Sequence, residues 1–130
     1  MIFIDTNYFL RLLLRDVRKQ HNQVRQLFFR AATGHEQLLT SVIVFFELYW
    51  VLESFYKKSK PELVNTLTNV LQLDFIRFEE RKLLIAGLNI YAKNSISLED
   101  AYNIVYARSN KAYSFGSFDK KLLKVYEHLT

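Results

Sequence analysis

Cysteine is absent from the 130-residue chain, which contains only one proline and three glycines. Without cysteine there are no disulfides, no thiolate metal ligands and no cysteine nucleophile, and this absence is typical of a reducing cytosol. The sequence also lacks a glycine-rich phosphate loop and the Gly-x-Ser-x-Gly turn of serine hydrolases. Enzymes that depend on a cysteine nucleophile, a glycine-rich phosphate loop or a Gly-x-Ser-x-Gly turn are therefore excluded.

Long hydrophobic runs are also scarce. The N-terminus has no basic segment followed by an apolar run of signal-peptide length. The longest apolar block, residues 42–52, is interrupted by Glu47, and a membrane-spanning helix needs about 20 apolar residues. We therefore expect neither export nor a membrane span, and a cytoplasmic location.

The composition that remains predicts a globular domain with a basic surface. Half of the residues are hydrophobic (50%), which suits one domain covering residues 1–130. The net charge of +5 favours polyanionic partners, of which nucleic acid is the commonest. If a protein with this charge gathers its acids in one pocket, the pattern indicates a metal site surrounded by phosphate-attracting charge.

Strands and helices are predicted to alternate along the chain. Strands are expected at 2–4, 38–40, 75–78 and 113–115. Helices are expected at 8–15, 19–33, 42–56, 61–71, 79–93, 98–110 and 118–126. Gly34 is expected to end the second helix, and Ser41 and Ser97 to cap later ones. This alternation predicts an α/β fold whose mainly parallel sheet is covered by helices on both faces.

The first strand leads directly into three polar residues. Asp5 follows the apolar residues 2–4, and Thr6 and Asn7 carry a hydroxyl and an amide that can cap a helix beginning near Tyr8. In an open α/β sheet, ligands bind beyond the carboxyl ends of the strands. Asp5 is therefore a candidate site residue; the alternative is an N-cap aspartate at an ordinary turn.

Glu47 is the only charged residue in the apolar block at 42–52. Its carboxylate is predicted to project from an apolar helix face, which is unfavourable unless an arginine or a metal ion compensates the charge. The alternative is an exposed glutamate, or a buried one paired with arginine. Its neighbours three and four positions away are Ile43, Val44, Trp50 and Val51.

Two further acids lie near predicted helix starts in the second half of the chain. Asp100 is in the first turn of the helix that Ser97 can cap, where the helix dipole favours acids. Asp119 follows the predicted strand at 113–115, and Gly116 lets the backbone turn sharply there. Each alone is more typical of a helix cap than of a metal ligand.

Together, these acids are predicted to converge at one edge of a parallel sheet. Repulsion between the carboxylates is relieved by a hard divalent cation, and oxygen-only ligands favour Mg²⁺ or Mn²⁺ over zinc. The histidines show no ligand spacing and are expected at the surface or at helix ends; they are His21, His35 and His128. The predicted ligands are Asp5, Glu47, Asp100 and Asp119.

Four sequence elements, in this order along the chain, carry a resemblance to a known family. They are the apolar strand before Asp5-Thr6-Asn7, Glu47 in its apolar helix, Asp100-Ala101 opening a helix that reaches Ala107, and Ser117-Phe118-Asp119 with Leu122 after it. The chain resembles the PIN-domain ribonucleases, and among them the small VapC-type toxins of type II toxin–antitoxin modules. The resemblance covers nearly the whole chain.

This resemblance implies a three-layer α/β sandwich and a Mg²⁺- or Mn²⁺-dependent endoribonuclease that hydrolyses RNA phosphodiester bonds. The four acids would form the catalytic metal site; Asp100 fits the third position better than Glu99, and Asp119 can act through water. Polar support would come from Thr6, Asn7 and Ser117. The implied partners are an RNA substrate (tRNA or another structured RNA), a cognate antitoxin and a second copy in a homodimer.

Basic residues around the predicted site are candidates for contacts with RNA phosphates. Lys120 and Lys121 are the strongest candidates because they directly follow Asp119. For each of these residues, the alternative is an ordinary solvated surface charge. The other candidates are Arg11, Arg15, Lys57, Lys58 and Lys60.

Two other functions fit parts of the sequence. A non-catalytic RNA- or protein-binding module would keep the basic surface, but the presence of all four acids argues against it. A metal-dependent phosphohydrolase acting on small phosphate esters would also begin at a strand-end aspartate. That chemistry usually needs a second aspartate two residues further on, where this chain has Asn7.

Overall fold

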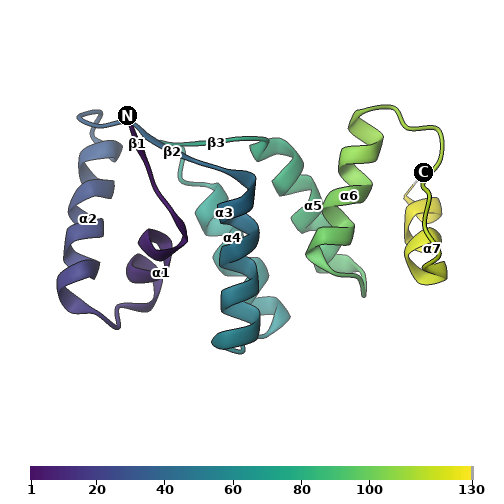
Figure 1. Ribbon diagram of the computed structural model, residues 1–130, viewed down its shortest axis with the longest axis horizontal. Helices are drawn as coiled ribbons and strands as arrows, with labels where there is room; N and C mark the ends of the chain where they lie inside the picture. The colour runs from purple at the N-terminus through teal and green to yellow at the C-terminus, as the bar shows by residue number, and fades with distance from the viewer. Residues whose placement is uncertain (130) are drawn as a thin grey trace. The chain divides into compact units, whose positions relative to one another are not determined.

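The computed structural model describes residues 1–129. By its internal contacts the chain divides into two compact units, Met1–Glu79 and Glu80–Thr130. The first unit contains the sheet and four α-helices, and the second contains three α-helices (Figure 1).

The sheet of the first unit has three parallel strands in the order β1-β2-β3, which are Ile2–Phe3, Leu38–Thr40 and Ile76–Phe78. Ile2 pairs with Leu38, and Leu38 pairs with Ile76. Ile4, Leu38 and Ile76 are at most 1% exposed. The predicted α/β class with a parallel sheet is therefore confirmed.

The helices of the first unit connect and cover these strands. Phe9 of the first helix packs against Phe28 of the second and Phe78 of β3, with ring centroids 6.0 and 6.1 Å apart. Gly34 follows the second helix at φ +84°, a left-handed conformation that favours glycine. The helices are α1 (Thr6–Leu14), α2 (Arg18–Ala32), α3 (Val42–Trp50) and α4 (Lys60–Leu71).

Helix starts in this unit follow local capping chemistry. The Ser41 hydroxyl accepts a hydrogen bond from the Val44 backbone N–H at 3.3 Å, as the sequence predicted. Pro61 lies in the first turn of α4, also as predicted. The predicted helix at 42–56 is an α-helix only as far as Trp50, and residues Val51–Phe55 form a π-helical turn after it.

The second unit is helical, with α5 (Arg81–Lys93), α6 (Leu98–Ser109) and α7 (Lys120–His128). Gly87 allows α5 and α6 to approach closely, since a Cβ atom there would lie 3.3 Å from the Tyr102 Cα atom. Buried side chains on both helices include Leu84, Leu88 and Ile104. No helix in residues 1–129 is long and apolar enough to span a membrane.

The predicted strand at 113–115 is wrong. Residues 112–118 are irregular, and Tyr113 is fully exposed (101%). A strand requires a hydrogen-bonded neighbour, whereas Phe115 instead packs against the Tyr126 ring of α7, with centroids 5.0 Å apart. Asp119 therefore follows a loop, and α7 begins at Lys120 rather than at 118.

Candidate active site

Asp5 lies between β1 and α1 and caps the helix with its own side chain. Its Oδ1 atom accepts hydrogen bonds from the backbone N–H groups of Asn7 (3.1 Å) and Tyr8 (3.3 Å). The cap is therefore Asp5 itself, one or two residues before the predicted Thr6 or Asn7, because α1 already begins at Thr6. Asp5 is exposed, and within residues 1–129 its Oδ2 atom has no hydrogen-bond partner.

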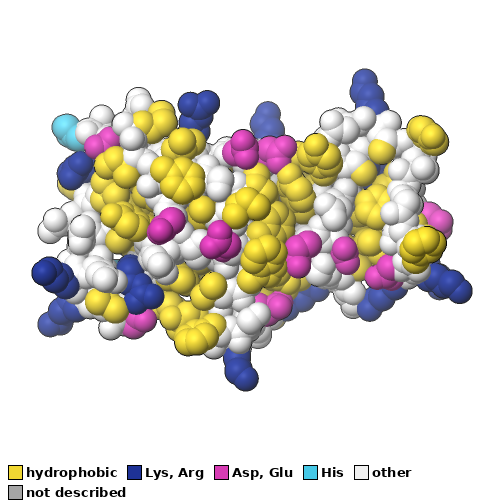
Figure 2. All heavy atoms as spheres, in the orientation of Figure 1, with side chains coloured by type: hydrophobic (Ala, Val, Ile, Leu, Met, Phe, Trp, Pro, Cys, Tyr) yellow, Lys and Arg dark blue, Asp and Glu magenta, His cyan; other side chains and the backbone are white. Residues whose placement is uncertain are grey.

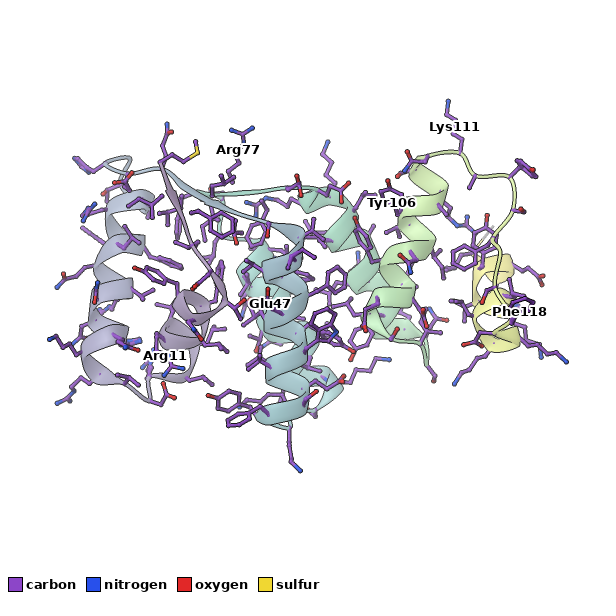
Figure 3. All side chains as sticks on the ribbon, in the orientation of Figure 1. Arg11, Glu47, Arg77, Tyr106, Lys111 and Phe118 are labelled. Atoms are coloured by element: carbon purple, nitrogen blue, oxygen red, sulfur yellow. The ribbon has the colours of Figure 1, made fainter. Side chains whose placement is uncertain are left out.

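Glu47 lies on α3 beside the turn that carries Asp5 (Figure 3). The Thr6 hydroxyl donates a hydrogen bond to Glu47 Oε2 at 3.3 Å, across 41 residues of sequence. Thr6 is itself buried (8% exposed), so its side chain has little freedom to turn away. The structure thus places Glu47 within hydrogen-bond distance of the residue that follows Asp5.

Glu47 is exposed, which matches the alternative of an exposed glutamate rather than a carboxylate on an unsolvated apolar face. The buried side of α3 consists of residues such as Val44, Phe45 and Leu48. Helical periodicity places Ile43 and Trp50 on the same side as Glu47, but those side chains are 62% and 42% exposed. The glutamate therefore emerges from an apolar face that is open to solvent.

Thr40 is a residue that the sequence analysis missed. It is 1% exposed at the end of β2, and its hydroxyl donates a hydrogen bond to the Ile4 carbonyl at 2.9 Å. This bond fixes the backbone immediately before Asp5. A polar residue at the end of a short buried strand was the available signal, but its partner lies 36 residues away in the sequence.

Asp100 occupies the first turn of α6, as predicted. Its backbone N–H donates to the Ser97 hydroxyl at 3.1 Å, which leaves the half-buried carboxylate free of a capping role. The neighbouring Glu99 is also half-buried, and within residues 1–129 its buried Oε1 atom has no hydrogen-bond partner. Neither carboxylate caps α6, because the Ser97 side chain fills that role.

Asp119 is the N-cap of α7. Its Oδ1 atom accepts a hydrogen bond from the Leu122 backbone N–H at 3.1 Å. The Ser117 hydroxyl in turn accepts from the Asp119 backbone N–H at 3.0 Å. Ser117 therefore shapes the turn that presents Asp119, and Lys120 and Lys121 follow as exposed residues.

Arg108 contacts the C-terminal end of α7, opposite the end that Asp119 caps. It was not among the residues predicted from the sequence. Its guanidinium donates hydrogen bonds to the carbonyls of Tyr126 (2.6 Å) and Leu129 (2.9 Å). Its Cζ atom also lies 4.8 Å from the centroid of the Tyr126 ring. Because α7 buries only Leu122, these contacts are a large share of what anchors the helix that Asp119 begins.

Replacing Arg108 with alanine is expected to lower the free energy of unfolding by about 1.5–3 kcal/mol, the range for hydrogen bonds to charged groups. Urea denaturation measures this change, and amide hydrogen exchange should accelerate most in α7. Lys93→Ala, at an exposed position in the last turn of α5, is the control and should change stability by less than about 0.5 kcal/mol. Equal effects of the two substitutions would contradict the anchoring role.

Two of the predicted basic residues, Arg11 and Lys58, form local ion pairs. Arg11 is half-buried and donates to Asp16 at 2.9 Å, while Arg15 is exposed at the end of α1. Lys58 pairs with Glu62 at 3.8 Å.

Each histidine ring forms a hydrogen bond with a nearby protein group, as expected for residues at the surface or at helix ends. His21 bonds with the Arg11 carbonyl, His35 with Thr33 and His128 with the Lys124 carbonyl.

The predicted ligands all offer carboxylate oxygens, the type of donor that suits a hard cation. Asp5 and Glu47 each use one oxygen for an internal hydrogen bond and keep the other free of such bonds within residues 1–129. Free carboxylate oxygens of this kind are the ligands that Mg²⁺ and Mn²⁺ prefer. Neither unit, over residues 1–129, holds three or more clustered acids or histidines by itself.

Comparison with known proteins identifies a family. No curated protein matches the chain. The PIN domain matches residues 2–128, a range that includes all four predicted acids. PIN domains are generally nucleases that act on RNA, and they generally use divalent metal ions. Since the match covers nearly the entire sequence, this chain belongs to the PIN-domain family.

Proposed function

We propose that this chain is a Mg²⁺- or Mn²⁺-dependent endoribonuclease. The observation that carries the proposal is the hydrogen bond from Thr6, the residue after Asp5, to Glu47. Within residues 1–129, Asp5 and Glu47 each keep one carboxylate oxygen free of hydrogen bonds. Asp5 follows the carboxyl end of β1, and ligands bind at this end of the strands in open α/β sheets. Asp100 and Asp119 complete the proposed set of ligands.

The two compact units are proposed to work as one domain of residues 1–130. The PIN-domain match runs through both units without interruption, from residue 2 to residue 128. Its two halves carry complementary parts of the proposed site, with Asp5 and Glu47 in the first and Asp100 and Asp119 in the second.

A divalent ion held by Asp5, Glu47, Asp100 and Asp119 would supply polarisation of the scissile phosphate and a lowered pKa of the attacking water. The chain's own residues position what the ion needs. Thr6 fixes the orientation of Glu47, and the backbone N–H groups of Asn7 and Tyr8 fix Asp5. Ser117 does the same for the turn before Asp119. With the nucleophile generated in this way, no histidine base is required.

RNA phosphates are proposed to contact cations near these acids. Lys120 and Lys121 directly follow Asp119, are exposed and form no ion pair within residues 1–129, so they are open to a polyanion. Arg15 is similarly exposed at the end of α1. Arg11, already hydrogen-bonded to Asp16, would have to share its guanidinium with the RNA.

The biological role is proposed to be that of a toxin acting in the cytoplasm on tRNA or another structured RNA, with a cognate antitoxin and a homodimeric assembly. Exposed apolar side chains support a protein partner near the site, because such surface marks interaction sites. They include Ile43, Trp50 and Phe55, the last of which is 75% exposed. Tyr49, in contrast, is buried and belongs to the core.

Thr6 provides a test of how Glu47 is positioned. Thr6→Val removes the hydroxyl at nearly constant volume, so cleavage is expected to fall about 10–100-fold, the range for groups that orient a metal ligand. The Mg²⁺ concentration for half-maximal activity should rise, and Thr6→Ser should restore both values. Wild-type cleavage and wild-type Mg²⁺ dependence in Thr6→Val would show that the hydrogen bond has no role in the reaction.

The proposed function as a whole is tested with purified protein and a mixed pool of tRNA and structured RNA, in Mg²⁺, in Mn²⁺ and in EDTA. Discrete products that appear only with metal are expected. Binding without cleavage in either metal would instead indicate a non-catalytic RNA-binding module. If neither binding nor cleavage is seen, the RNA assignment itself is wrong.

A further inference from the structure

Helix α2 presents an outer face that the proposed active site does not use. The buried face of α2 consists of Val24, Leu27, Phe28 and Ala31. The helix carries no acidic residue, and its cations are Arg18, Lys19, Arg25 and Arg30. Figure 2 shows Lys and Arg side chains gathered where α2 follows α1. Its outer face is therefore uniformly cationic or neutral.

Five side chains on this face line a pocket of ≈ 510 Å³. Their spacing of three and four residues places them along one side of the helix. Two of them are cationic, two are amides and one is aromatic. We call this set the α2 track; it consists of Asn22, Arg25, Gln26, Phe29 and Arg30.

The α2 track continues toward the proposed active site. A second pocket, of ≈ 250 Å³, shares Gln26 and Arg30 with the first and is also lined by Tyr8. The Tyr8 backbone N–H is one of the two groups that hold Asp5 Oδ1. A chain of adjacent lining residues thus leads, within the first unit, from the outer face of α2 to the helix start that presents Asp5.

Phe29 is the aromatic member of the α2 track, and Arg25 is its cation without an ion pair in residues 1–129. Phe29 is 68% exposed, so the face of its ring is open for a ligand to stack on. Within residues 1–129 its ring contacts no other aromatic ring, and Arg25 forms no ion pair. Arg30 differs, because it pairs with Glu36 at 3.3 Å.

We propose that the α2 track binds a single-stranded segment of the RNA substrate, with a base stacked on Phe29 and a phosphate held by Arg25. An exposed aromatic ring flanked by cations is the combination that single-stranded nucleic acids require, since every base offers a flat face and every linkage a charge. The absence of acids from α2 favours RNA over a protein partner. The proposal rests on the ribonuclease function and extends it to a substrate-binding surface.

The track is tested by RNA binding with Asp5→Asn protein, which is expected not to cleave. Fluorescence anisotropy with a single-stranded RNA of about 12 nucleotides, within the usual site sizes for such surfaces, measures the affinity. Phe29→Leu and Arg25→Gln are each expected to weaken binding at least about fivefold, a loss within the range for one stacked base or one phosphate contact. Arg25→Gln should also lower the salt slope by about 0.7.

Arg18→Gln is the matched control, because it removes a cation from the same exposed helix outside the track. Circular dichroism confirms folding of each variant, and Phe29 and Arg25 are exposed enough for the fold to survive their replacement. The proposed RNA contact at the α2 track is wrong if Phe29→Leu and Arg25→Gln both keep the wild-type affinity, or if Arg18→Gln loses as much affinity as they do. If Phe29→Leu and Arg25→Gln weaken capture of a protein partner and leave RNA affinity intact, the RNA assignment is wrong.

The outcomes separate this proposal from the ribonuclease proposal. If wild-type protein binds RNA through Arg25 and Phe29 but never cleaves it, the track is supported and the catalytic function is wrong. If it cleaves RNA and both variants keep wild-type affinity and KM, the catalytic function is supported and the track is wrong. If both proposals are correct, the Phe29→Leu protein cleaves RNA with a raised KM and little change in kcat.

Discussion

Asp5→Asn is expected to abolish RNA cleavage, with a loss greater than about 100-fold, while the protein remains folded. The loss should exceed the 10–100-fold range for groups that only orient a metal ligand, since Asp5 is proposed to bind the ion directly. The fold should survive because asparagine is as good an N-cap as aspartate, and the α1 cap bonds from Asn7 and Tyr8 can form with its side-chain oxygen.

Loss of the charge at the start of α1 is expected to cost no more than about 0.3–1 kcal/mol in the free energy of unfolding. Thermal unfolding of the wild-type and variant proteins is therefore measured alongside the cleavage assay. Asp74→Asn is the matched control, as an exposed aspartate of the same unit that lies outside the proposed site. Full activity in Asp5→Asn would remove Asp5 from the mechanism.

Glu47→Gln is expected to have a comparable effect on cleavage. Glutamine can still accept the hydrogen bond from Thr6 through its side-chain oxygen, so the substitution removes charge and leaves the local contact in place. Because Glu47 is exposed, no buried charge is released, and stability should change by less than about 0.5 kcal/mol. Rates over a series of Mn²⁺ concentrations measure the loss.

The control for Glu47 is Glu53→Gln, an exposed glutamate in the π-helical turn that follows α3. Its cleavage rate should equal that of the wild type. A Glu47→Gln protein that cleaves at the wild-type rate at every metal concentration would show that the glutamate is an ordinary surface residue, as an exposed position alone would suggest.

The elements that the sequence predicted best are those governed by local chemistry. The β2 strand lies at the predicted residues, and Ser41, Pro61 and Ser97 mark helix starts as expected. Side-chain caps and the restrictions of proline act within three or four residues, so a single sequence carries enough information to place them.

The errors concern partners that lie far away in the sequence. Residues 113–115 have the composition of a strand but no hydrogen-bonded neighbour. For Glu47, the helical pattern gave the correct apolar neighbours but could not show that this face is open. Thr40 and Arg108 were missed because their partners lie 36 and at least 18 residues away.

Metal binding tests the central proposal, that acids of both units hold the same ion, most directly. Mn²⁺ titration followed by electron paramagnetic resonance compares wild-type protein with Asp5→Asn and Asp100→Asn, and with Asp74→Asn as control. The proposal predicts that Asp5→Asn and Asp100→Asn each weaken Mn²⁺ binding by more than about 10-fold, and that Asp74→Asn binds like the wild type. Wild-type Mn²⁺ affinity in Asp100→Asn, alongside its loss in Asp5→Asn, would contradict a shared site.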